Sequence, residues 1–307
     1  MYELWFIFED VILPVFILIA LGFLMQRKFR LDLYTLAKVN LYFLVPGLIF
    51  VKLYETHFSL SLFAQVLVFF VIYSVILYLI SQVVSRMFRF GRGMKTAFSN
   101  SVIFYNSGNY GIPVNDLVFR HDPFALSIQV LILAFQDILM FSYGIFSLET
   151  INGGKLKAIL GYFKMPVFYA LVLGIGLNLM EVPIPSFLWV PANYVSDAAI
   201  AAALLTLGAQ VAQLRFEFGL FQVYLSVGIR LILGPLLALA IILVWGMESV
   251  MAQALLISSA MPTAVNSAII AQEYKNKPDF AAQTVLFSTI LSAITVSIVI
   301  YLARAMF

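Results

Sequence analysis

Long apolar runs alternate with short polar segments along the whole chain. Each run, folded as a helix, is long enough to cross the roughly 30 Å of hydrocarbon in a bilayer. The pattern therefore predicts an all-α integral membrane protein with about ten transmembrane helices and short connections. The expected helices cover residues 4–25, 33–53, 61–84, 95–118, 124–147, 158–180, 196–214, 219–246, 250–273 and 281–303.

Two of these runs are interrupted by polar segments that contain proline. The first is Asn106 to Pro113 in the fourth expected helix, and the second is Met261 to Asn266 in the ninth. A break inside a membrane helix leaves backbone groups unpaired, and lipid cannot satisfy them. Breaks therefore persist where they surround a ligand or a water-filled cavity, which is typical of transporters.

Each break predicts part of a binding site. Proline is tolerated at the first position of a helix, so we expect Pro113 and Pro262 to begin the second half of each broken helix. Gly108 and Gly111 would let the chain unwind before Pro113. The two new helix starts carry partial positive charge and free N–H groups, which suits a carboxylate. The expected substrate-binding side chains around them are Asn106, Asn109, Thr263 and Asn266.

Two other interpretations of the breaks stay open. The prolines can simply kink buried helices, as prolines in membrane helices often do. Each amide side chain can instead form a hydrogen bond between neighbouring helices.

Two ionisable residues fall near the middle of expected helices, Asp137 in the fifth and Arg230 in the eighth. Each is costly where it faces lipid, so both are expected to face protein, water or one another. Three hypotheses follow: Arg230 holds a substrate carboxylate, Asp137 carries a proton or Na⁺, or the two form a fixed ion pair. Gln136 belongs to a polar stripe with Gln129 and Tyr143, and at the depth of the first break it is a further substrate-binding candidate.

The composition agrees with a membrane protein. Hydrophobic residues make up 63% and charged residues 11% of the chain, with a mean hydropathy of +1.02, more apolar surface than a soluble core can bury. The small net charge of +3 disfavours a nucleic-acid partner, and the lack of cysteine excludes disulfides and thiolate metal sites. Without phosphate-loop, metal-ligand or nucleophile–base motifs, we expect no ATP-driven pump, enzyme, metal or cofactor, apart from a coupling Na⁺ or H⁺.

Lys and Arg residues are concentrated in alternate loops, which predicts that both termini face outside. Glu3, Glu9 and Asp10 precede or begin the first run, which favours a retained span over a cleaved signal peptide. The expected location is the plasma membrane, or the inner membrane of a bacterium, with His57 and His121 solvated in outer loops. The expected cytoplasmic loops carry Arg27, Lys28, Arg30, Lys38, Arg86, Arg89, Arg92, Lys95, Lys155, Lys157, Lys164, Arg215, Lys275 and Lys277, and the outer loops carry Lys52 and Arg120.

Prolines recur at matching places in the two halves of the chain. Pro113 and Pro262 are about half the chain apart, and Pro14 and Pro166 mark the first and sixth expected helices. We therefore expect two five-helix repeats, residues 1–150 and 151–307. An odd number of spans inverts the second repeat relative to the first, an arrangement common in secondary transporters.

The two breaks and several other segments resemble the auxin efflux carrier family, which includes the plant PIN-formed carriers and their bacterial relatives. Gly111-Ile112-Pro113 is similar to the end of that family's first crossover, and Met261-Pro262 to its second. The likeness covers nearly the whole chain. The other similar segments are Gln136 with Glu149, Lys164-Met165-Pro166 with Gly174, Ala271-Gln272-Glu273-Tyr274, Pro278-Asp279 and Thr284-Val285-Leu286-Phe287.

The resemblance implies crossed, broken fourth and ninth helices in two inverted repeats. It implies a transport domain of helices 3–5 and 8–10 that moves like an elevator against a scaffold of helices 1, 2, 6 and 7, in a homodimer. It also implies transport of organic anions: auxin in plants, and malate or malonate-like dicarboxylates in bacterial relatives.

This chain departs from the plant carriers at two places. It has only a short linker between its halves, and it has Asn266 where the plant carriers have a second proline, which argues against auxin specificity. The leading hypothesis is a secondary transporter for a small organic anion such as a carboxylate, dicarboxylate or auxin-like acid. The alternatives are a sodium- or proton-coupled symporter or antiporter that uses Asp137 and, with less support, a membrane receptor.

Overall fold

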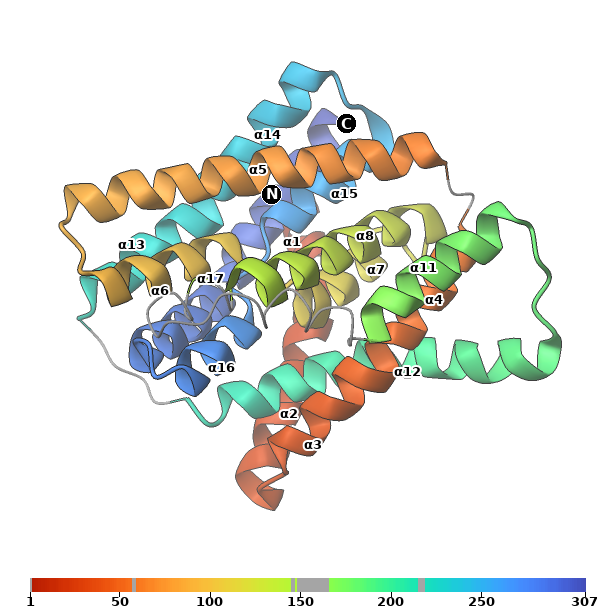
Figure 1. Cartoon of the computed structure of the whole chain (residues 1–307), viewed down its shortest axis with the longest axis horizontal. Helices are drawn as coiled ribbons and strands as arrows, with labels where there is room; N and C mark the ends of the chain where they lie inside the picture. Colours follow the sequence, from red (N-terminus) through yellow and green to blue (C-terminus); the bar gives the residue numbers. More distant parts are fainter. Residues whose placement is uncertain (1, 57–58, 145–146, 148–165, 215–218) are drawn as a thin grey trace.

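The computed structural model describes residues 2–56, 59–144, 147, 166–214 and 219–307, and these residues form helices joined by short loops (Figure 1). Seven of the helices are long and apolar enough to cross a membrane. These are Tyr2–Phe29, Leu33–Glu55, Leu60–Met87, Pro123–Gly144, Ser186–Val211, Phe221–Trp245 and Pro278–Met306. Several residues used above lie outside the described part: His57, Glu149, Lys155, Lys157, Lys164, Met165, Arg215 and the expected start of the sixth helix.

Four of these long helices contain a π-helical turn. They are α1 (Tyr2–Ile7), η1 (Phe8–Ile12) and α2 (Leu13–Phe29); α3 (Leu33–Val39), η2 (Asn40–Leu44) and α4 (Val45–Glu55); α8 (Pro123–Leu139) with η4 (Met140–Gly144); and α13 (Phe221–Gly228), η5 (Ile229–Leu233) and α14 (Gly234–Trp245). The other three are α5 (Leu60–Met87), α12 (Ser186–Val211) and α17 (Pro278–Met306). A shorter apolar helix, α11 (Pro166–Leu179), precedes α12.

Two further segments are helical but interrupted. The first consists of α6 (Arg92–Ile103), η3 (Ser107–Gly111) and α7 (Ile112–Val118), and the second of α15 (Ser249–Ser259) and α16 (Val265–Glu273). The first break, residues 104–106, ends at the start of the expected segment Asn106 to Pro113, whose remaining residues are helical. The second break, residues 260–264, largely coincides with the expected segment Met261 to Asn266.

Prolines explain most of the π-helical turns. Pro14, Pro46, Pro113 and Pro235 each lie two residues after the last residue of such a turn. Proline has no N–H to donate, and its ring crowds the carbonyl four residues earlier, so the regular i to i−4 pattern fails there. The preceding turn widens to the i to i−5 pattern instead. These irregularities are therefore encoded locally.

Short polar side chains fix where several helices begin. The side chains of Asp32, Ser59 and Asp122 accept hydrogen bonds from backbone N–H groups in the first turns of α3, α5 and α8. Such caps satisfy N–H groups that have no acceptor within the helix. Beside Asp32, the hydroxyl of Thr35 donates a second hydrogen bond, which lowers the pKa of that carboxyl.

Burial separates peripheral from central helices. Only 33% of the apolar window of α5 is buried, and its exposed side chains include Val68, Val75 and Leu79, as expected of a face turned toward lipid. In the helix formed by α8 and η4, 82% of the window is buried. α8 therefore lies inside the bundle, where its polar side chains can meet the breaks.

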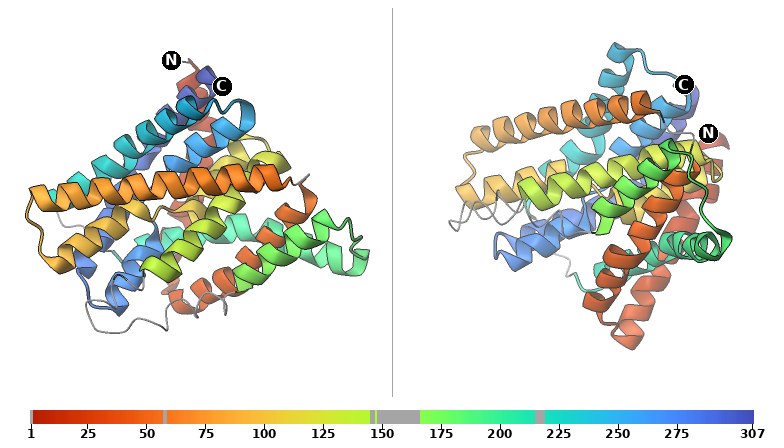
Figure 2. Two further views of the ribbon diagram at one scale, coloured as in Figure 1. Left: turned by 45° about the horizontal axis from the view of Figure 1, so that its top comes forward. Right: turned by 45° about the vertical axis from the view of Figure 1, so that its right-hand side comes forward.

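The helices pack as two groups. α12 packs against α2 and α4, and α11 packs against α4, at the lower right of Figure 1. α5, α6, α8 and α13 to α17 pack mainly with one another and form the rest of the molecule, as the rotated views in Figure 2 also show. The groups meet where α12 contacts η3 and α7 and where α4 contacts α8.

Glycines let α2 and α12 approach each other closely. A Cβ atom at Gly22 would overlap the backbone of Leu205, and one at Gly208 would overlap the backbone of Ile19 and Phe23. Small residues at such crossings let helix backbones touch, which is the main source of helix association in membranes.

We expect Gly208→Ala to lower the melting temperature in detergent, because the added methyl must push two backbones apart. Gly228→Ala is the matched control: its added methyl meets no atom within 4 Å, and alanine favours the helix by about 1 kcal/mol. Thermal unfolding of both variants checks this. A stability of Gly208→Ala equal to that of Gly228→Ala would contradict the close crossing.

Candidate functional site

The two breaks cross each other and form backbone hydrogen bonds. Tyr105 and Thr263 form an isolated antiparallel bridge. The N–H of Asn106 donates to the carbonyl of Pro262 at 2.7 Å, and the N–H of Ala264 donates to the carbonyl of Phe104 at 3.0 Å. Each unwound segment therefore provides hydrogen-bond partners for backbone groups of the other. These groups are then not left unpaired inside the membrane.

The C-terminal end of α6 is satisfied in the same region. Its last carbonyl groups have no N–H donor within the helix, and each accepts a hydrogen bond from another part of the chain. The donors are the hydroxyl of Thr263 to Ser101 O (3.0 Å), Arg230 Nη1 to Val102 O (3.0 Å), Gln136 Nε2 to Ile103 O (3.1 Å) and the N–H of Ala264 to Phe104 O.

Arg230 joins the C-terminal ends of both first half-helices. Besides Val102 O at the end of α6, its guanidinium donates to Ser259 O at the end of α15 and to the hydroxyl of Tyr73. It is fully buried and lies over the ring of Tyr105, 4.7 Å from the ring centroid. A positive charge is favourable there because both helix ends are electronegative. The hypothesis that Arg230 holds a substrate carboxylate is therefore not supported: its contacts are to protein carbonyls, and it lies outside the cavity described next.

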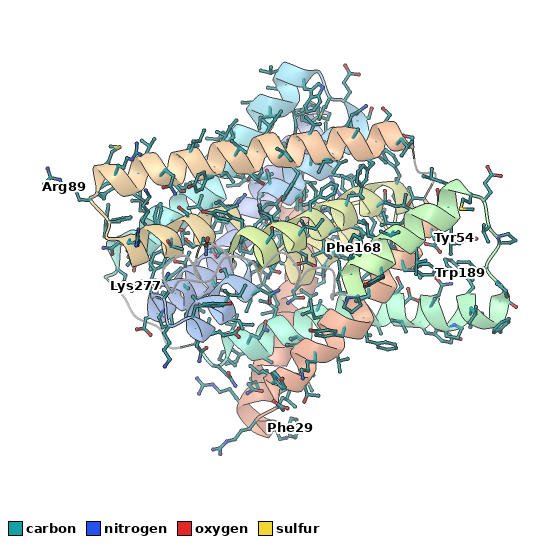
Figure 3. All side chains as sticks on the ribbon, viewed as in Figure 1. Phe29, Tyr54, Arg89, Phe168, Trp189 and Lys277 are labelled. Atoms are coloured by element: carbon teal, nitrogen blue, oxygen red, sulfur yellow. The ribbon has the colours of Figure 1, made fainter. Side chains whose placement is uncertain are left out.

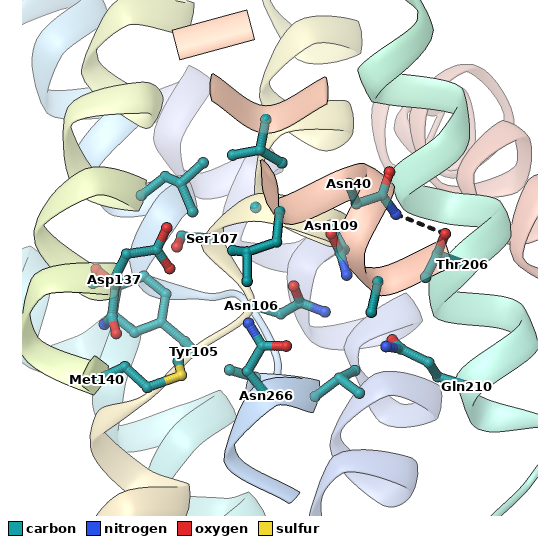
Figure 4. Close-up of a pocket in the computed structure, with 18 residues that line it drawn as sticks. Asn40, Tyr105, Asn106, Ser107, Asn109, Asp137, Met140, Thr206, Gln210 and Asn266 are labelled. Carbon is teal, nitrogen blue, oxygen red and sulfur yellow. Dashed lines mark hydrogen bonds between the residues drawn. The ribbon is translucent and has the colours of Figure 1, made fainter. Parts of the chain in front are cut away.

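The opposite ends of the breaks border a cavity of about 80 Å³ (Figure 4). It lies between the breaks, α8, the turn η2 and α12. Its lining residues are Ala37, Asn40, Leu41, Val45, Tyr105, Asn106, Ser107, Gly108, Asn109, Leu133, Gln136, Asp137, Met140, Thr206, Gln210, Ala264, Val265 and Asn266.

Two helix starts face this cavity. η3 begins at Ser107 and α16 begins at Val265, and the first residues of both line the cavity. The first N–H groups of a helix lack intrahelical acceptors and carry partial positive charge, so both starts favour an anion. The side chains of Asn106, Asn109 and Asn266 project into the same space in Figure 4. The buried Nδ2 atom of Asn106 has no hydrogen-bond partner among the described residues.

The sequence-based site residues divide into those that line the cavity and those that do not. Asn106, Asn109, Gln136, Asn266, Gly108 and Asp137 line it. Thr263 does not: it is fully buried, its hydroxyl bonds Ser101 O, and its N–H bonds the hydroxyl of Ser288. Thr263 is therefore a structural residue of the crossing, and its assignment to substrate binding is corrected.

The prolines do not begin the second half-helices as expected. Pro113 lies in the first turn of α7, behind η3, so the helical second half already begins at Ser107. Pro262 lies within the unwound segment, three residues before Val265, and its carbonyl accepts from Asn106. Pro262 shapes the crossing through that carbonyl.

A glycine is needed at position 111 because of the limited space there, and not because of an unusual backbone conformation. Its φ and ψ of −67° and −43° are ordinary helical values, and a Cβ atom there would collide with the amide of Gln129. That amide donates to Ser107 O and accepts from Asn115, both at 2.7 Å. Gly111 therefore lets Gln129 hold the start of η3. Gly108 similarly allows the close approach of Leu133.

Asp137 and Arg230 do not form an ion pair. In the part of the chain that the structure describes, neither takes part in one, and the two terminal nitrogens of Arg230 donate to carbonyl and hydroxyl oxygens. Asp137 is 6% exposed and faces the cavity, and its carboxylate has no hydrogen bond from any described residue. The fixed-pair hypothesis is corrected, and Asp137 is left as the charged group of the cavity wall.

Among the lining residues that sequence reasoning missed are the polar residues Asn40, Thr206 and Gln210. They lie in η2 and α12, on the side away from the breaks. A signal was present, because all three are polar positions inside apolar runs, and Thr206 and Gln210 are four residues apart on one helix face.

His121 is also more constrained than a free loop side chain. Its ring is exposed, as expected, but its Nδ1 atom lies 2.8 Å from a carboxylate oxygen of the buried Asp116. This contact joins the loop after α7 to that helix.

Comparisons with known proteins indicate membrane transport. A family model described as "Membrane transport protein" matches residues 6–158 and 155–300. An "Uncharacterized transporter" of Methanothermobacter thermautotrophicus is 26% identical over 93% of this chain and 95% of its own length. A "Putative malonate transporter" of Rhizobium meliloti is 26% identical over 57% of each chain.

The apolar helices and the family match define a multi-pass membrane transport protein. The chain belongs to the membrane transport protein family, that of the auxin efflux carriers that its sequence resembles.

We expect Arg230→Met to lower the melting temperature strongly, because Val102 O loses its donor and Ser259 O keeps only that of Tyr73, at about 1–3 kcal/mol for an unsatisfied buried group. Arg230→Lys keeps the charge with fewer donors and should recover part of the loss. Arg304→Met, which removes a hydrogen bond to Val118 O at the end of α7, is a control with a smaller effect. Thermal unfolding in detergent measures all three. Wild-type stability in Arg230→Met would refute the capping role.

Proposed function

We propose that this protein is a secondary transporter that carries a small organic anion through the crossing of its two interrupted helices. One observation carries the proposal: the positive starts of η3 and α16 and the amides of Asn106, Asn109 and Asn266 border one cavity. Such a cavity stabilises a carboxylate by N–H donors and helix dipoles without a fixed cation.

The size of the cavity favours a small acid. Its volume of about 80 Å³ corresponds to roughly six water-sized spheres of about 10–15 Å³ each. That space suits an acid of about three or four carbons, and an indole ring needs more. A malonate-sized dicarboxylate therefore fits better than an auxin-like acid, and the name of the Rhizobium meliloti relative agrees with this choice.

For the mechanism we propose alternating access of the elevator type, in ten helices arranged as two inverted repeats. The scaffold would be the helices containing α2, α4, α11 and α12, and the transport domain would be the remaining helices. The position of the cavity between these groups supports this division. A membrane receptor would not need a ligand site between two groups of helices that move relative to each other.

We further propose a homodimer in the plasma membrane with both termini outside. Arg89 and Lys277, assigned to cytoplasmic loops, lie at one end of the molecule in Figure 3, and Tyr54 and Trp189 lie at the other. This agrees with the positive-inside rule.

We expect Asn106→Ala and Asn266→Ala each to reduce malonate uptake into proteoliposomes about tenfold, because each removes a hydrogen bond to a charged ligand. Asn193→Ala is the control: that amide bonds Trp189 O in α12, away from the cavity. Uptake of labelled malonate is the measurement. Unchanged uptake in both cavity variants would refute the site, and no uptake of any small carboxylate by wild type would refute the function.

The second candidate is coupling of transport to Na⁺ or H⁺ through Asp137. Its carboxylate faces the cavity without a partner among the described residues, and of the described lining residues it is the one with an ionisable acidic or basic group. An unpaired buried carboxylate beside an anionic substrate is unfavourable, so a proton or a cation would accompany the substrate.

If Asp137 couples transport, wild-type malonate uptake should rise with an inward sodium or proton gradient, and Asp137→Asn should lose that response. Asp197→Asn, at an exposed position of α12, should keep it. Gradient-driven uptake assays distinguish the cases. A wild type that ignores both gradients, or a response that persists in Asp137→Asn, would remove this candidate.

A further inference from the structure

The cavity has a second polar wall, across from α8. Asn40, Thr206 and Gln210 form it, and in Figure 4 they lie across the cavity from Asp137 and Tyr105. All three are buried, with 7%, 3% and 8% of their surface exposed. Polar side chains buried this deeply normally have hydrogen-bond partners.

Two of the three side chains are held in place by each other. Asn40 Nδ2 donates to the hydroxyl oxygen of Thr206 at 2.7 Å. Asn40 is the first residue of the π-helical turn η2, whose wider spacing depends on Pro46. This interaction fixes the orientation of both side chains, so the wall does not have to be ordered when a ligand binds.

Gln210 is the exception, because its buried Oε1 atom has no hydrogen-bond partner among the described residues. It lies four residues after Thr206 on the same face of α12. A buried amide without a partner costs free energy unless a ligand or water supplies the missing hydrogen bond. The amide group can present either its oxygen or its nitrogen to such a ligand.

We propose that Asn40, Thr206 and Gln210 form a second subsite that binds the far, oxygen-bearing end of a small dicarboxylate. This inference rests on the proposed function, in which the starts of η3 and α16 bind the first carboxylate. The second wall offers amide and hydroxyl groups and no cation, which suits hydrogen bonding to a carboxyl group at one end of a short acid. A monocarboxylate would leave this wall unpaired, so the subsite selects acids with two polar ends.

The subsite also has a consequence for the transport cycle. Asn40, Thr206 and Gln210 belong to the helices that pack with α2 and α4, whereas the helix starts belong to the other group. Relative movement of the two groups of helices would separate the two ends of the site and lower its affinity for a dicarboxylate.

The test compares binding of malonate and propionate, two acids with equal numbers of carbons, by ligand-dependent thermal stabilisation. Gln210→Met preserves the length of the side chain and removes its hydrogen-bonding groups. We expect it to raise the Kd of malonate about tenfold or more, and to change the Kd of propionate less than about twofold. Gln213→Met, at an exposed position just after α12, should leave both Kd values unchanged.

Thr206→Val provides a second, nearly isosteric variant for the same comparison, in case Gln210→Met does not fold. Selective loss of malonate binding in either variant supports the subsite. An unchanged malonate Kd, or equal losses for both acids, would overturn the subsite while leaving the proposed function in place. If the wild-type protein binds neither malonate nor any other small carboxylate, the proposed function itself fails.

Discussion

The structure depends on how backbone groups are satisfied where two membrane helices are interrupted. Lipid offers no hydrogen bonds, so every carbonyl and N–H group in the breaks needs a partner within the protein. The partners come from distant parts of the chain. The two unwound segments bond each other between Asn106 and Pro262 and between Ala264 and Phe104, and side chains from α8, η5 and the second break complete the end of α6.

This arrangement separates the partial negative charges at the C-terminal ends of the half-helices from the partial positive charges at their N-terminal ends. The electronegative ends of α6 and α15 meet at Arg230, deep in the protein and away from the cavity. The electropositive starts of η3 and α16 face the cavity, which Asp137 also lines. One buried arginine thereby neutralises the electronegative half-helix ends, and under the proposed function the opposite ends would bind the anionic substrate.

Much of the fold was predictable from local patterns. The apolar runs predicted the positions of the long helices. The polar segment around Pro262 predicted the second break, and the one around Pro113 predicted the first break several residues too late in the chain. These signals are local, because a proline or a short amide cluster disturbs the helix that contains it. The length and burial of each half-helix were not predictable in the same way, since they depend on packing between distant segments.

The candidate site was only half predictable for the same reason. Asn106, Asn109 and Asn266 lie next to the breaks and were found. Thr263 was assigned to the substrate because sequence cannot show that its hydroxyl turns to Ser101. Asn40 and Thr206, which are bonded to each other across 166 positions of sequence, are brought to the cavity by helix packing alone.

The most direct test of this account is an experimental structure of the protein in lipid nanodiscs with malonate. The account predicts ligand density between residues 107–109 and 264–266, with the chain non-helical at 104–106 and 260–264. Continuous helices through these residues, or malonate bound elsewhere with this cavity empty, would contradict it.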